Sequence, residues 1–209
     1  MSPEEIERIV QGSHALNFAR GDVLFHRGDP STGFYVAVHG QVKLALSSSQ
    51  GIEKVVELFG TGQSFGEAVM SMNKPYPVYA QALTDLLTIH INKDVIFGGI
   101  ESDPVFCRKM LAGLFFRLHR LIHYVESFSL RSSEQRVIGY LLQDIGEIKA
   151  GQGMKVSLLA NKNVIASNLN ITPEAFSRIL HHLSCEGLIE VKGKEVYIRD
   201  IGKLRAFEG

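Results

Sequence analysis

The sequence predicts an α+β protein with a small antiparallel β-barrel, a long helix and a helical C-terminal domain that ends in a β-hairpin. Three patterns support this fold class. Short alternating runs separated by glycines fill residues 18–91, apolar residues recur at spacings of three and four in residues 111–128, and two helical patterns flank a turn in residues 163–188. We therefore divide the chain into three domains: residues 1–102, 103–130 and 131–209.

The composition is that of an ordinary globular protein. The chain has 209 residues, of which 45% are hydrophobic and 21% charged, and its net charge is zero. No apolar run reaches the ~20 residues needed to cross a bilayer, and the acidic N-terminus has no signal-peptide pattern, so we expect a cytoplasmic protein with no membrane partner. Residues 131–209 carry 11 basic and 9 acidic residues, so phosphate binding there depends on where the charges lie.

The predicted barrel follows a short amphipathic helix at residues 3–12 and runs from Phe18 to Ile91. Polar and apolar residues alternate, and turn signals recur roughly every ten residues, as in small antiparallel barrels. Glycines mark the predicted corners: Gly21, Gly28, Gly33, Gly40, Gly51, Gly60 and Gly62.

One long helix is predicted from Pro104 to Phe128, with Asp103 as its N-cap. The spacing of its apolar residues is that of a two-stranded coiled coil and predicts a homodimer, whereas the alternative is a buried helix in a monomer. This dimerisation seam consists of Leu111, Leu114, Leu118, Leu121, Val125 and Phe128. A second stripe is expected to face the barrel: Phe115, Phe116, His119 and Ile122.

The C-terminal domain is predicted to begin after a hinge at residues 129–133, with a helix over 136–142 and a short strand, MKVSLL. Two helices then meet at Asn170, a residue that tolerates a left-handed backbone. The second of them starts with the N-cap Thr172 and with Pro173, and it stops at Gly187. Its buried face consists of Phe176, Ile179, Leu180 and Leu183, and a hairpin with Gly193-Lys194 at its turn follows.

This arrangement is a winged helix-turn-helix, whose second helix enters the major groove of DNA. Its exposed face begins with Glu174, Ser177 and Arg178. Arg can bond a guanine bidentately, Glu can accept from cytosine N4, and Ser can reach a neighbouring base; the alternative is a solvated helix face. Phosphate contacts are assigned to hairpin residues that would suit a solvated surface equally well: Lys192, Lys194 and Arg199.

Glu174-x-x-Ser177-Arg178 resembles the recognition-helix pattern of the CRP/FNR family of transcription regulators. The segment ITPEAFSRILHHLSCEGLI is similar to the DNR-type branch, which controls genes of nitrogen-oxide respiration. The resemblance implies a TTGAT-like half-site whose inner G·C pairs are read by Glu174 and Arg178, with Ser177 setting preference at an adjacent pair. It also implies a homodimer on palindromic double-stranded DNA, with RNA polymerase as a partner. The expected DNA-binding residues are Thr172, Pro173, Glu174, Ser177, Arg178, Lys192 and Lys194.

The segments GDVLFHRGDPSTGFYVAVHGQVKL and GQSFGEAVM resemble the cyclic-nucleotide-binding jelly roll of the same family. In cAMP-binding members a Gly-Glu pair holds the ribose, and a downstream Arg-Ser pair holds the cyclic phosphate. Gly66-Glu67 is present here, but Pro77 and Val78 stand where that arginine would fall. Burying a phosphate without a cation is costly, so cAMP is not expected and Gly66-Glu67 is interpreted as a structural turn.

DNR-type regulators are held to bind haem and to respond to nitric oxide, so the resemblance implies a haem-linked effector. The effector pocket is assigned to Gly66, Glu67, Phe115, His119 and His123. The haem iron is assigned to His14, His119 or His123, and a surface or hydrogen-bonded role is the alternative for each of them. No iron–sulfur cluster is expected, because the only cysteines are Cys107 and Cys185 and an FNR-type cluster needs four.

Two other functions remain open. One is an enzyme on a jelly-roll barrel, as in cupins, and the other is a cyclic-nucleotide-binding module without a DNA function. Cupin chemistry needs a His/Glu metal cluster, and residues 18–91 contain no HxH spacing. An enzyme would also leave the helix-turn-helix unexplained. The sequence therefore predicts an effector-gated DNA-binding regulator that is not an enzyme.

Overall fold

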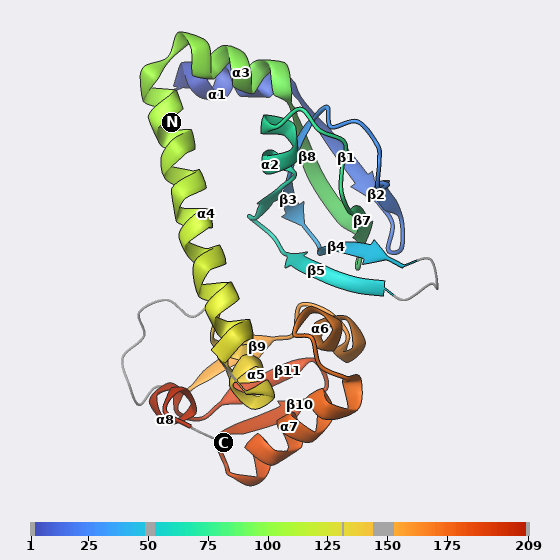
Figure 1. Ribbon diagram of the computed structural model, residues 1–209, viewed down its shortest axis with the longest axis vertical. Coiled ribbons are helices and arrows are strands. Elements are labelled where there is room, and N and C mark those ends of the chain that lie inside the picture. The colour runs from blue at the N-terminus through green and yellow to red at the C-terminus, as the bar shows by residue number, and fades with distance from the viewer. Residues whose placement is uncertain (1–2, 49–52, 131, 144–152, 208–209) are drawn as a thin grey trace. The chain divides into compact units, whose positions relative to one another are not determined.

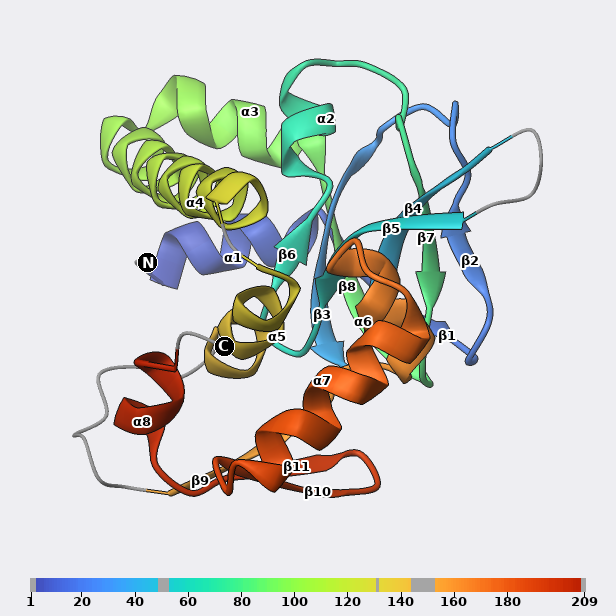
Figure 2. The same cartoon turned by 60° about the horizontal axis from the view of Figure 1, so that its bottom comes forward.

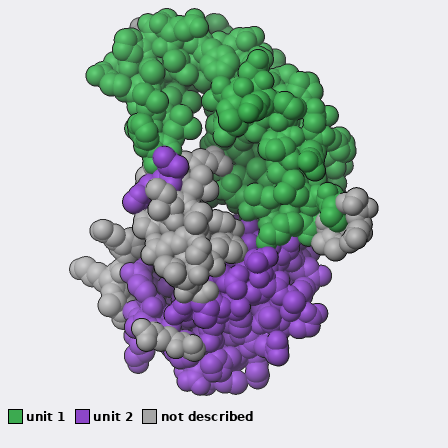
Figure 3. Space-filling view, viewed as in Figure 1, with its two compact units in different colours: residues 1–117 green, residues 118–209 purple. Residues whose placement is uncertain are grey.

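The computed structural model describes residues 3–48, 53–130, 132–143 and 153–207, without the side chains of residues 4–5, 116–117 and 120–130. The chain forms two compact units, residues 1–117 and 118–209, which Figure 3 colours separately. Within the described residues, no helix is long and apolar enough to cross a membrane.

Two four-stranded antiparallel sheets form the first unit, which confirms the predicted jelly roll (Figure 1). One sheet has the order β1 (Ser13–Phe18), β8 (Leu86–Asn92), β3 (Gly33–His39) and β6 (Ser64–Phe65). The other has the order β2 (Val23–Phe25), β7 (Tyr79–Ala82), β4 (Val42–Ser47) and β5 (Glu53–Phe59). The first strand begins at Ser13 and not at Phe18, where the barrel was predicted to start. The prediction missed its first residues because polar side chains among them obscure the alternation of polar and apolar residues.

Two apolar cores hold this unit together. Side chains between the two sheets form the first core, and most of its largest members are aromatic: Phe25, Tyr35, Phe59, Phe65 and Tyr76. The second core includes Phe34, Met70, Ile91, Ile96 and Phe106, so it joins β3 and β8 to the helices. These helices are α1 (Pro3–Gln11) and α4 (Pro104–Leu130), which were predicted, and α2 (Glu67–Ser71) and α3 (Lys93–Ser102), which were not. Two glycines weaken the helical propensity of α3, and burial of Ile96 and Gly99 offsets that weakness.

The predicted corners are confirmed at four glycines with left-handed backbones: Gly21, Gly28, Gly40 and Gly62. Gly51 lies outside the described residues. Gly33 is not a corner, because it is the first residue of β3. A Cβ on Gly33 would lie 2.0 Å from the carbonyl oxygen of Ile91 in the neighbouring strand, so the two backbones approach too closely for any other residue.

Helix α4 (Pro104–Leu130) continues from the first unit into the second. Asp103 caps it as predicted, because its Oδ1 accepts hydrogen bonds from the backbone nitrogens of Val105 and Phe106 at 2.9 and 3.1 Å. The hinge predicted at residues 129–133 is wrong in extent. Residues 129 and 130 belong to α4, and α5 (Ser133–Leu142) begins directly after its N-cap, Ser132.

The second unit contains the predicted strand, helix-turn-helix and hairpin (Figure 1). After α5 come β9 (Met154–Ser157), α6 (Lys162–Asn168), α7 (Pro173–Cys185), β10 (Ile189–Lys192), β11 (Glu195–Ile198) and α8 (Ile201–Arg205). The strands form one antiparallel sheet in the order β10-β11-β9. Buried apolar side chains of this unit come from α5, α6, α7, β10, β11 and α8, and the fully buried ones include Val137, Ile165, Phe176, Leu183, Val196 and Leu204. Helix α8 was not predicted.

Replacing Gly33 with alanine should destabilise the first unit, because the new methyl group collides with a backbone oxygen that cannot move independently. We expect a loss of about 2–4 kcal/mol in the free energy of unfolding, measured by urea denaturation. Gly98→Ala in α3 is the matched control, since a Cβ there meets nothing within 4 Å. It should be neutral or stabilising by about 0.5–1 kcal/mol. Equal behaviour of the two variants would contradict the close approach.

Candidate nucleic-acid interface and sensor site

The corner between α6 and α7 is closed by backbone hydrogen bonds. Asn170 has a left-handed φ of 56°, and its N–H donates to the carbonyl of Ser167 at 3.2 Å. The N–H of Ile171 donates to the carbonyl of Ala166 at 3.0 Å, which completes a Schellman motif at the end of α6. Ala166 is completely buried, so its small side chain lets the second helix cross closely. The predicted corner at Asn170 is confirmed.

Helix α7 begins and ends as the sequence predicted. The Thr172 side chain accepts a hydrogen bond from the backbone nitrogen of Ala175 at 3.2 Å, and Pro173 occupies the first turn. Gly187, with a φ of 70°, follows the last turn. Phe176, Leu180 and Leu183 are buried, and Ile179 is half-buried. Their packing fixes the rotation of α7 about its own axis.

The opposite face of α7 carries the residues predicted to contact bases. Glu174 and Arg178 are exposed, and Ser177 lies between them at intermediate exposure. Thr172 is exposed beside them, and Pro173 is partly exposed. The structure thus brings the five residues predicted around the start of α7 onto one short segment whose polar groups reach solvent. Figure 2 gives a view of this helix within the second unit.

The hairpin lysines differ in their surroundings. Lys192 Nζ lies 2.8 Å from Glu190 Oε1 and 5.3 Å from the centre of the Tyr197 ring, so this ammonium already has a carboxylate partner. That hydrogen bond raises the pKa of Lys192. Lys194 is exposed at the turn next to Gly193. Lys162, exposed in the first turn of α6, is a further cation that the sequence analysis missed, although the Asn161 N-cap before it marks a helix start.

In the first unit, Gly66-Glu67 opens α2. Gly66 has a left-handed φ of 95°, and Glu67 is the first helical residue. A Cβ on Gly66 would make ordinary van der Waals contacts, at 3.6 Å from Phe34 Cα and 3.7 Å from the Tyr76 ring, so Tyr76 lies next to Gly66. The Tyr76 ring stacks on Phe25 with centroids 3.7 Å apart, and its hydroxyl donates to the Gly33 carbonyl at 3.3 Å.

The aromatic core next to Gly66 is polar only at its edges. Burial raises the pKa of Tyr35 to about 12, with the neighbouring Tyr76 and Asp29 contributing. Tyr35 stacks on Phe65 with centroids 5.3 Å apart. Of the two residues that stand where the phosphate arginine would fall, Pro77 is exposed and Val78 packs against the aromatic core; Lys74, three residues before Pro77, is also exposed. The barrel interior beside Gly66 is therefore filled by the protein's own rings.

The remaining effector candidates whose side chains the structure describes are exposed. Phe115 was expected to pack on the barrel, but its side chain is 65% exposed, so this expectation is wrong. His119 is also exposed. His123 lies among the side chains outside the described set, as do Phe116 and Ile122. His14 is exposed on β1, opposite His90 in the strand register. Burial, followed by the neighbouring His14, lowers the pKa of His90, whose Nε2 lies 3.2 Å from Thr32 Oγ1.

The dimerisation seam is exposed where its side chains are described. Leu111, Leu114 and Leu118 are 44%, 41% and 54% exposed. The other members, Leu121, Val125 and Phe128, lie outside the described side chains. A run of leucines exposed at helical spacing is an apolar stripe, and such stripes mark interaction surfaces.

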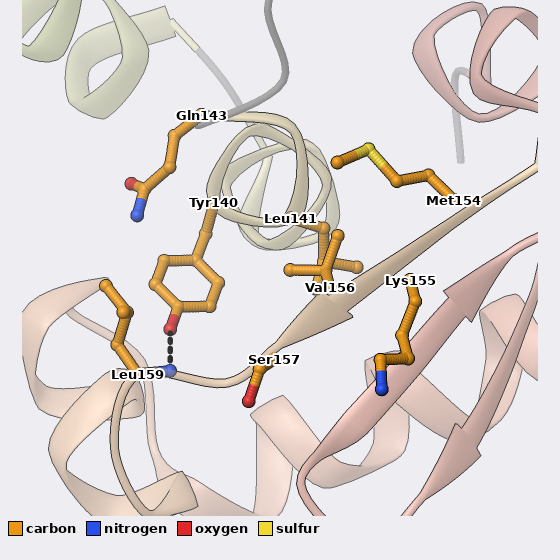
Figure 4. A pocket seen from close by; sticks show the side chains of 8 residues that line it. All are labelled: Tyr140, Leu141, Gln143, Met154, Lys155, Val156, Ser157 and Leu159. Atoms are coloured by element: carbon orange, nitrogen blue, oxygen red, sulfur yellow. Dashed lines mark hydrogen bonds between the residues drawn. The ribbon is translucent and has the colours of Figure 1, made fainter. Parts of the chain in front are cut away.

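A cavity of about 180 Å³ lies in the second unit between α5 and β9 (Figure 4). It is lined by Tyr140, Leu141, Gln143, Met154, Lys155, Val156, Ser157 and Leu159. Pockets for organic ligands occupy roughly 300–1,000 Å³, so this cavity is too small for a nucleotide or a haem. Within the described residues, no three His, Cys, Asp or Glu side chains gather into a metal-binding group.

Comparison with known proteins identifies two domains, which follow one another along the chain in the same order as the two units of the structure. The family model of the cyclic nucleotide-binding domain matches residues 15–103, and the model of the Crp-like helix-turn-helix domain matches residues 135–207. A Ruegeria pomeroyi protein named for cyclic nucleotide binding is 32% identical, over 98% of this chain and 89% of that one, with a TM-score of 0.71.

Two further relatives extend the likeness to named regulators. The structure of DNR from Pseudomonas aeruginosa is 32% identical, over 100% of this chain and 92% of that one, with a TM-score of 0.54. The CRP-like cAMP-activated global transcriptional regulator of Mycobacterium tuberculosis is 23% identical over 98% of this chain and 92% of that protein.

One contact at the C-terminal end of α7 makes stability depend on pH. His182 Nδ1 lies 2.7 Å from Glu134 Oε1 in α5, and this hydrogen bond raises the pKa of His182; Glu186 lies on its other side at 3.8 Å. A raised folded-state pKa stabilises the fold fully below the unfolded value, near 6.5. That stabilisation is lost as the pH rises through the folded pKa.

We therefore expect His182→Gln to lower the urea midpoint more at about pH 5.5 than at about pH 9. The matched control is His181→Gln, since His181 contacts Cys185 and not Glu134. Urea denaturation followed by circular dichroism at both pH values measures the difference. An equal shift of the His182→Gln midpoint at both pH values would contradict the contact.

Proposed function

Because this chain belongs to the CRP/FNR family of transcription regulators, we propose that it is a homodimer that binds a palindromic DNA site through α7 and is controlled by an effector of its N-terminal unit. The observation that carries this proposal is the presentation of Glu174 and Arg178 on a helix whose opposite face is locked in a core. In helix-turn-helix proteins this end of the second helix meets base edges in the major groove.

The chemistry of these side chains fits a half-site with inner G·C pairs. Arg178 offers a bidentate donor for guanine O6 and N7, and Glu174 offers an acceptor for cytosine N4. Ser177, between them on α7, has a short hydroxyl that reaches only a base directly below the helix. The TTGAT-like sequence of the half-site is what the resemblance of the segment ITPEAFSRILHHLSCEGLI to DNR-type regulators implies.

Phosphate contacts are assigned to cations around α7. Lys162 opens the helix that crosses the DNA backbone in this motif, and Lys194 is exposed at the hairpin turn. Lys192 is a weaker candidate, because a phosphate must compete with Glu190 for its ammonium. RNA polymerase is the partner expected of such a regulator once the dimer occupies a promoter.

Dimerisation follows from the leucine stripe on α4. Pairing this stripe with the same stripe of a second copy would cover Leu111, Leu114 and Leu118 and relate two α7 helices by a two-fold axis. Helix-turn-helix dimers read half-sites that lie one turn of DNA apart, about 34 Å. A palindromic site matches this symmetry.

The effector is proposed not to be a cyclic nucleotide, although the Mycobacterium tuberculosis relative is named as cAMP-activated. A buried phosphate needs a cation or several donors, and Pro77 and Val78 supply neither. A nucleotide that entered the space between the two sheets would also have to displace the stacked rings of Phe25 and Tyr76.

Haem with nitric oxide is the effector implied by the resemblance of the segment ITPEAFSRILHHLSCEGLI to DNR-type regulators. The described histidines do not fit a haem pocket as they stand. His14, His26, His39, His119, His181 and His182 are exposed, and His90 is half-buried beside Thr32. The resemblance to DNR-type regulators is therefore the support for haem.

The DNA-binding proposal is tested by a gel shift at moderate salt. We expect the protein to bind a TTGAT-N4-ATCAA duplex far more tightly than a scrambled duplex of the same composition. Arg178→Ala should cost about 1–3 kcal/mol on the specific duplex and little on the scrambled one. Ser177→Gly should change the base preference at one position of each half-site. Equal binding of both duplexes by the wild type would rule out a sequence-specific regulator.

The effector proposal is tested on the same purified dimer. Cyclic AMP should raise neither the melting temperature nor the affinity for the TTGAT duplex. Haemin should give a Soret band that shifts on addition of nitric oxide and is weakened by His14→Ala, His119→Ala or His123→Ala. Stabilisation by cAMP would overturn the reading of Pro77 and Val78, and an unchanged haemin spectrum would remove haem.

A further inference from the structure

We propose that Glu190 and Glu195 restrain sequence-independent DNA binding, because they hold the lysines of the hairpin sheet in ion pairs that a DNA phosphate must break. This restraint rests on the proposed function and involves two residues that read no base. The hairpin sheet consists of β9, β11 and β10, in which β11 pairs with both other strands (Figure 1). All residues of the restraint belong to this one sheet.

One face of the hairpin sheet carries two lysines and two glutamates around a tyrosine. Val196 and Ile198 are buried in the core, so the residues that alternate with them in β11 point the other way. Their partners in β9 and β10 share that face, because directly paired residues of neighbouring strands lie on the same side of a sheet. These residues form the hairpin charge network: Lys155, Glu190, Lys192, Glu195 and Tyr197.

Each lysine of the hairpin charge network is held by a carboxylate. Lys192 Nζ lies 2.8 Å from Glu190 Oε1, and Lys155 Nζ lies 2.7 Å from Glu195 Oε1. The Tyr197 hydroxyl donates to Glu195 Oε2 at 2.6 Å, so the second oxygen of that carboxylate is also bound. In the register of the strands, Lys192 stands directly opposite Glu195, so a second carboxylate lies beside its own partner. The four charges of the network therefore cancel one another.

The two carboxylates are ionised at neutral pH, yet the pairs remain open to exchange. The hydrogen bond from Lys192 lowers the pKa of Glu190, and the hydrogen bond from Lys155, followed by that from Tyr197, lowers the pKa of Glu195. The side chains of Lys192 and Glu190 are 63% and 46% exposed, so ions in solution reach them. Exposed ion pairs add little to stability. The network therefore matters less for the fold than for what the lysines can bind.

A phosphate would meet this network at the hairpin turn. Lys192 ends β10, and the turn at Gly193 and Lys194 follows it. A phosphate that takes the Lys192 ammonium leaves the Glu190 carboxylate unpaired beside another anion, so a repulsion accompanies the new attraction. Lys194 is exposed and forms no ion pair within the hairpin sheet. Two lysines of one hairpin thus differ in whether a carboxylate competes for them.

This difference predicts how DNA binding responds to salt. Each phosphate that a protein cation neutralises adds about 0.9 to the steepness with which log K falls against the logarithm of the salt concentration. Lys194 should contribute to this slope, whereas Lys192 should contribute less while Glu190 holds it. Glu190 and Glu195 therefore lower the affinity for DNA of any sequence and leave base readout by α7 unchanged. Such a restraint reduces the share of the protein that is held on non-specific DNA.

The test follows the fluorescence anisotropy of a scrambled duplex and of the TTGAT-N4-ATCAA duplex between about 50 and 200 mM salt. Glu190→Gln should steepen the slope by up to about 0.9 and tighten binding several-fold at the lowest salt, because a neutral amide holds an ammonium less strongly than a carboxylate does. Glu195→Gln should act in the same direction but less, since it releases Lys155 in the strand that does not adjoin β10. The ratio of the two affinities should not change in either variant.

Two sets of controls separate the restraint from a general change in charge. Glu186→Gln removes the same charge from an exposed residue of the same unit, which lies 3.8 Å from His182 Nε2 and not beside a lysine. It should steepen the slope less than Glu190→Gln. Lys192→Gln should lower the slope more in the Glu190→Gln protein than in the wild type, whereas Lys194→Gln should lower it equally in both.

Each protein is measured at a temperature where thermal unfolding shows it to be folded. Equal slopes for the wild type and Glu190→Gln, or equal steepening by Glu186→Gln and Glu190→Gln, would overturn the restraint and leave the proposed function intact. Equal binding of both duplexes by the wild type would overturn the sequence-specific function. In that case the slopes on the scrambled duplex would still decide whether the carboxylates restrain DNA binding.

Discussion

The left-handed backbone of Asn170 is the constraint on which the DNA-binding unit depends. It lets the chain end α6 at Asn168 and start α7 at Pro173 with only four residues between them, so no long loop has to be ordered at an entropic cost. The fully buried Ala166 then allows the helices to cross closely. Once Phe176 and Leu180 are packed, Glu174 and Arg178 face solvent as a geometric consequence. The reading surface therefore needs no side-chain contacts of its own to hold it in place.

A different constraint governs the sensor unit, where the space between two sheets must be filled. Rings from four strands and one loop fill it, and Tyr76 closes the region beside Gly66. The glycine keeps the left-handed conformation that opens α2, so the turn persists as a feature of the fold. The lack of a cation for a phosphate and the aromatic side chains that fill the space both disfavour the binding of a cyclic nucleotide there. An effector of this unit must bind elsewhere or displace a stacked pair.

Local signals predicted most of the helix-turn-helix, whereas long-range packing decided what the sequence analysis missed. The Thr172 cap, Pro173, Asn170 and Gly187 act within a few residues of themselves, so their types reveal their roles. Helices α3 and α8 depend on burial against distant residues and have weak propensities. Gly33 was predicted to be a turn residue, but glycine is needed there because the backbone approaches that of Ile91 closely. Since Ile91 is 58 residues away, the sequence around Gly33 carries no signal of this contact. The hydrogen bond from Arg136 Nη1 to the carbonyl of Leu169 likewise spans more than 30 residues, and no local pattern announces it.

The zero net charge of the chain limits how much long-range electrostatic attraction can contribute to DNA binding. At zero net charge, long-range attraction to DNA is weak, and on the hairpin sheet Lys192 and Lys155 already lie within 2.8 and 2.7 Å of Glu190 and Glu195. A phosphate gains little from a lysine that must first leave a carboxylate. Affinity then has to come from joining two half-sites, because linked sites bind at a high effective concentration only when both can be engaged at once. A DNA-binding dimer whose lysines already have carboxylate partners would therefore gain affinity chiefly by engaging both half-sites at once.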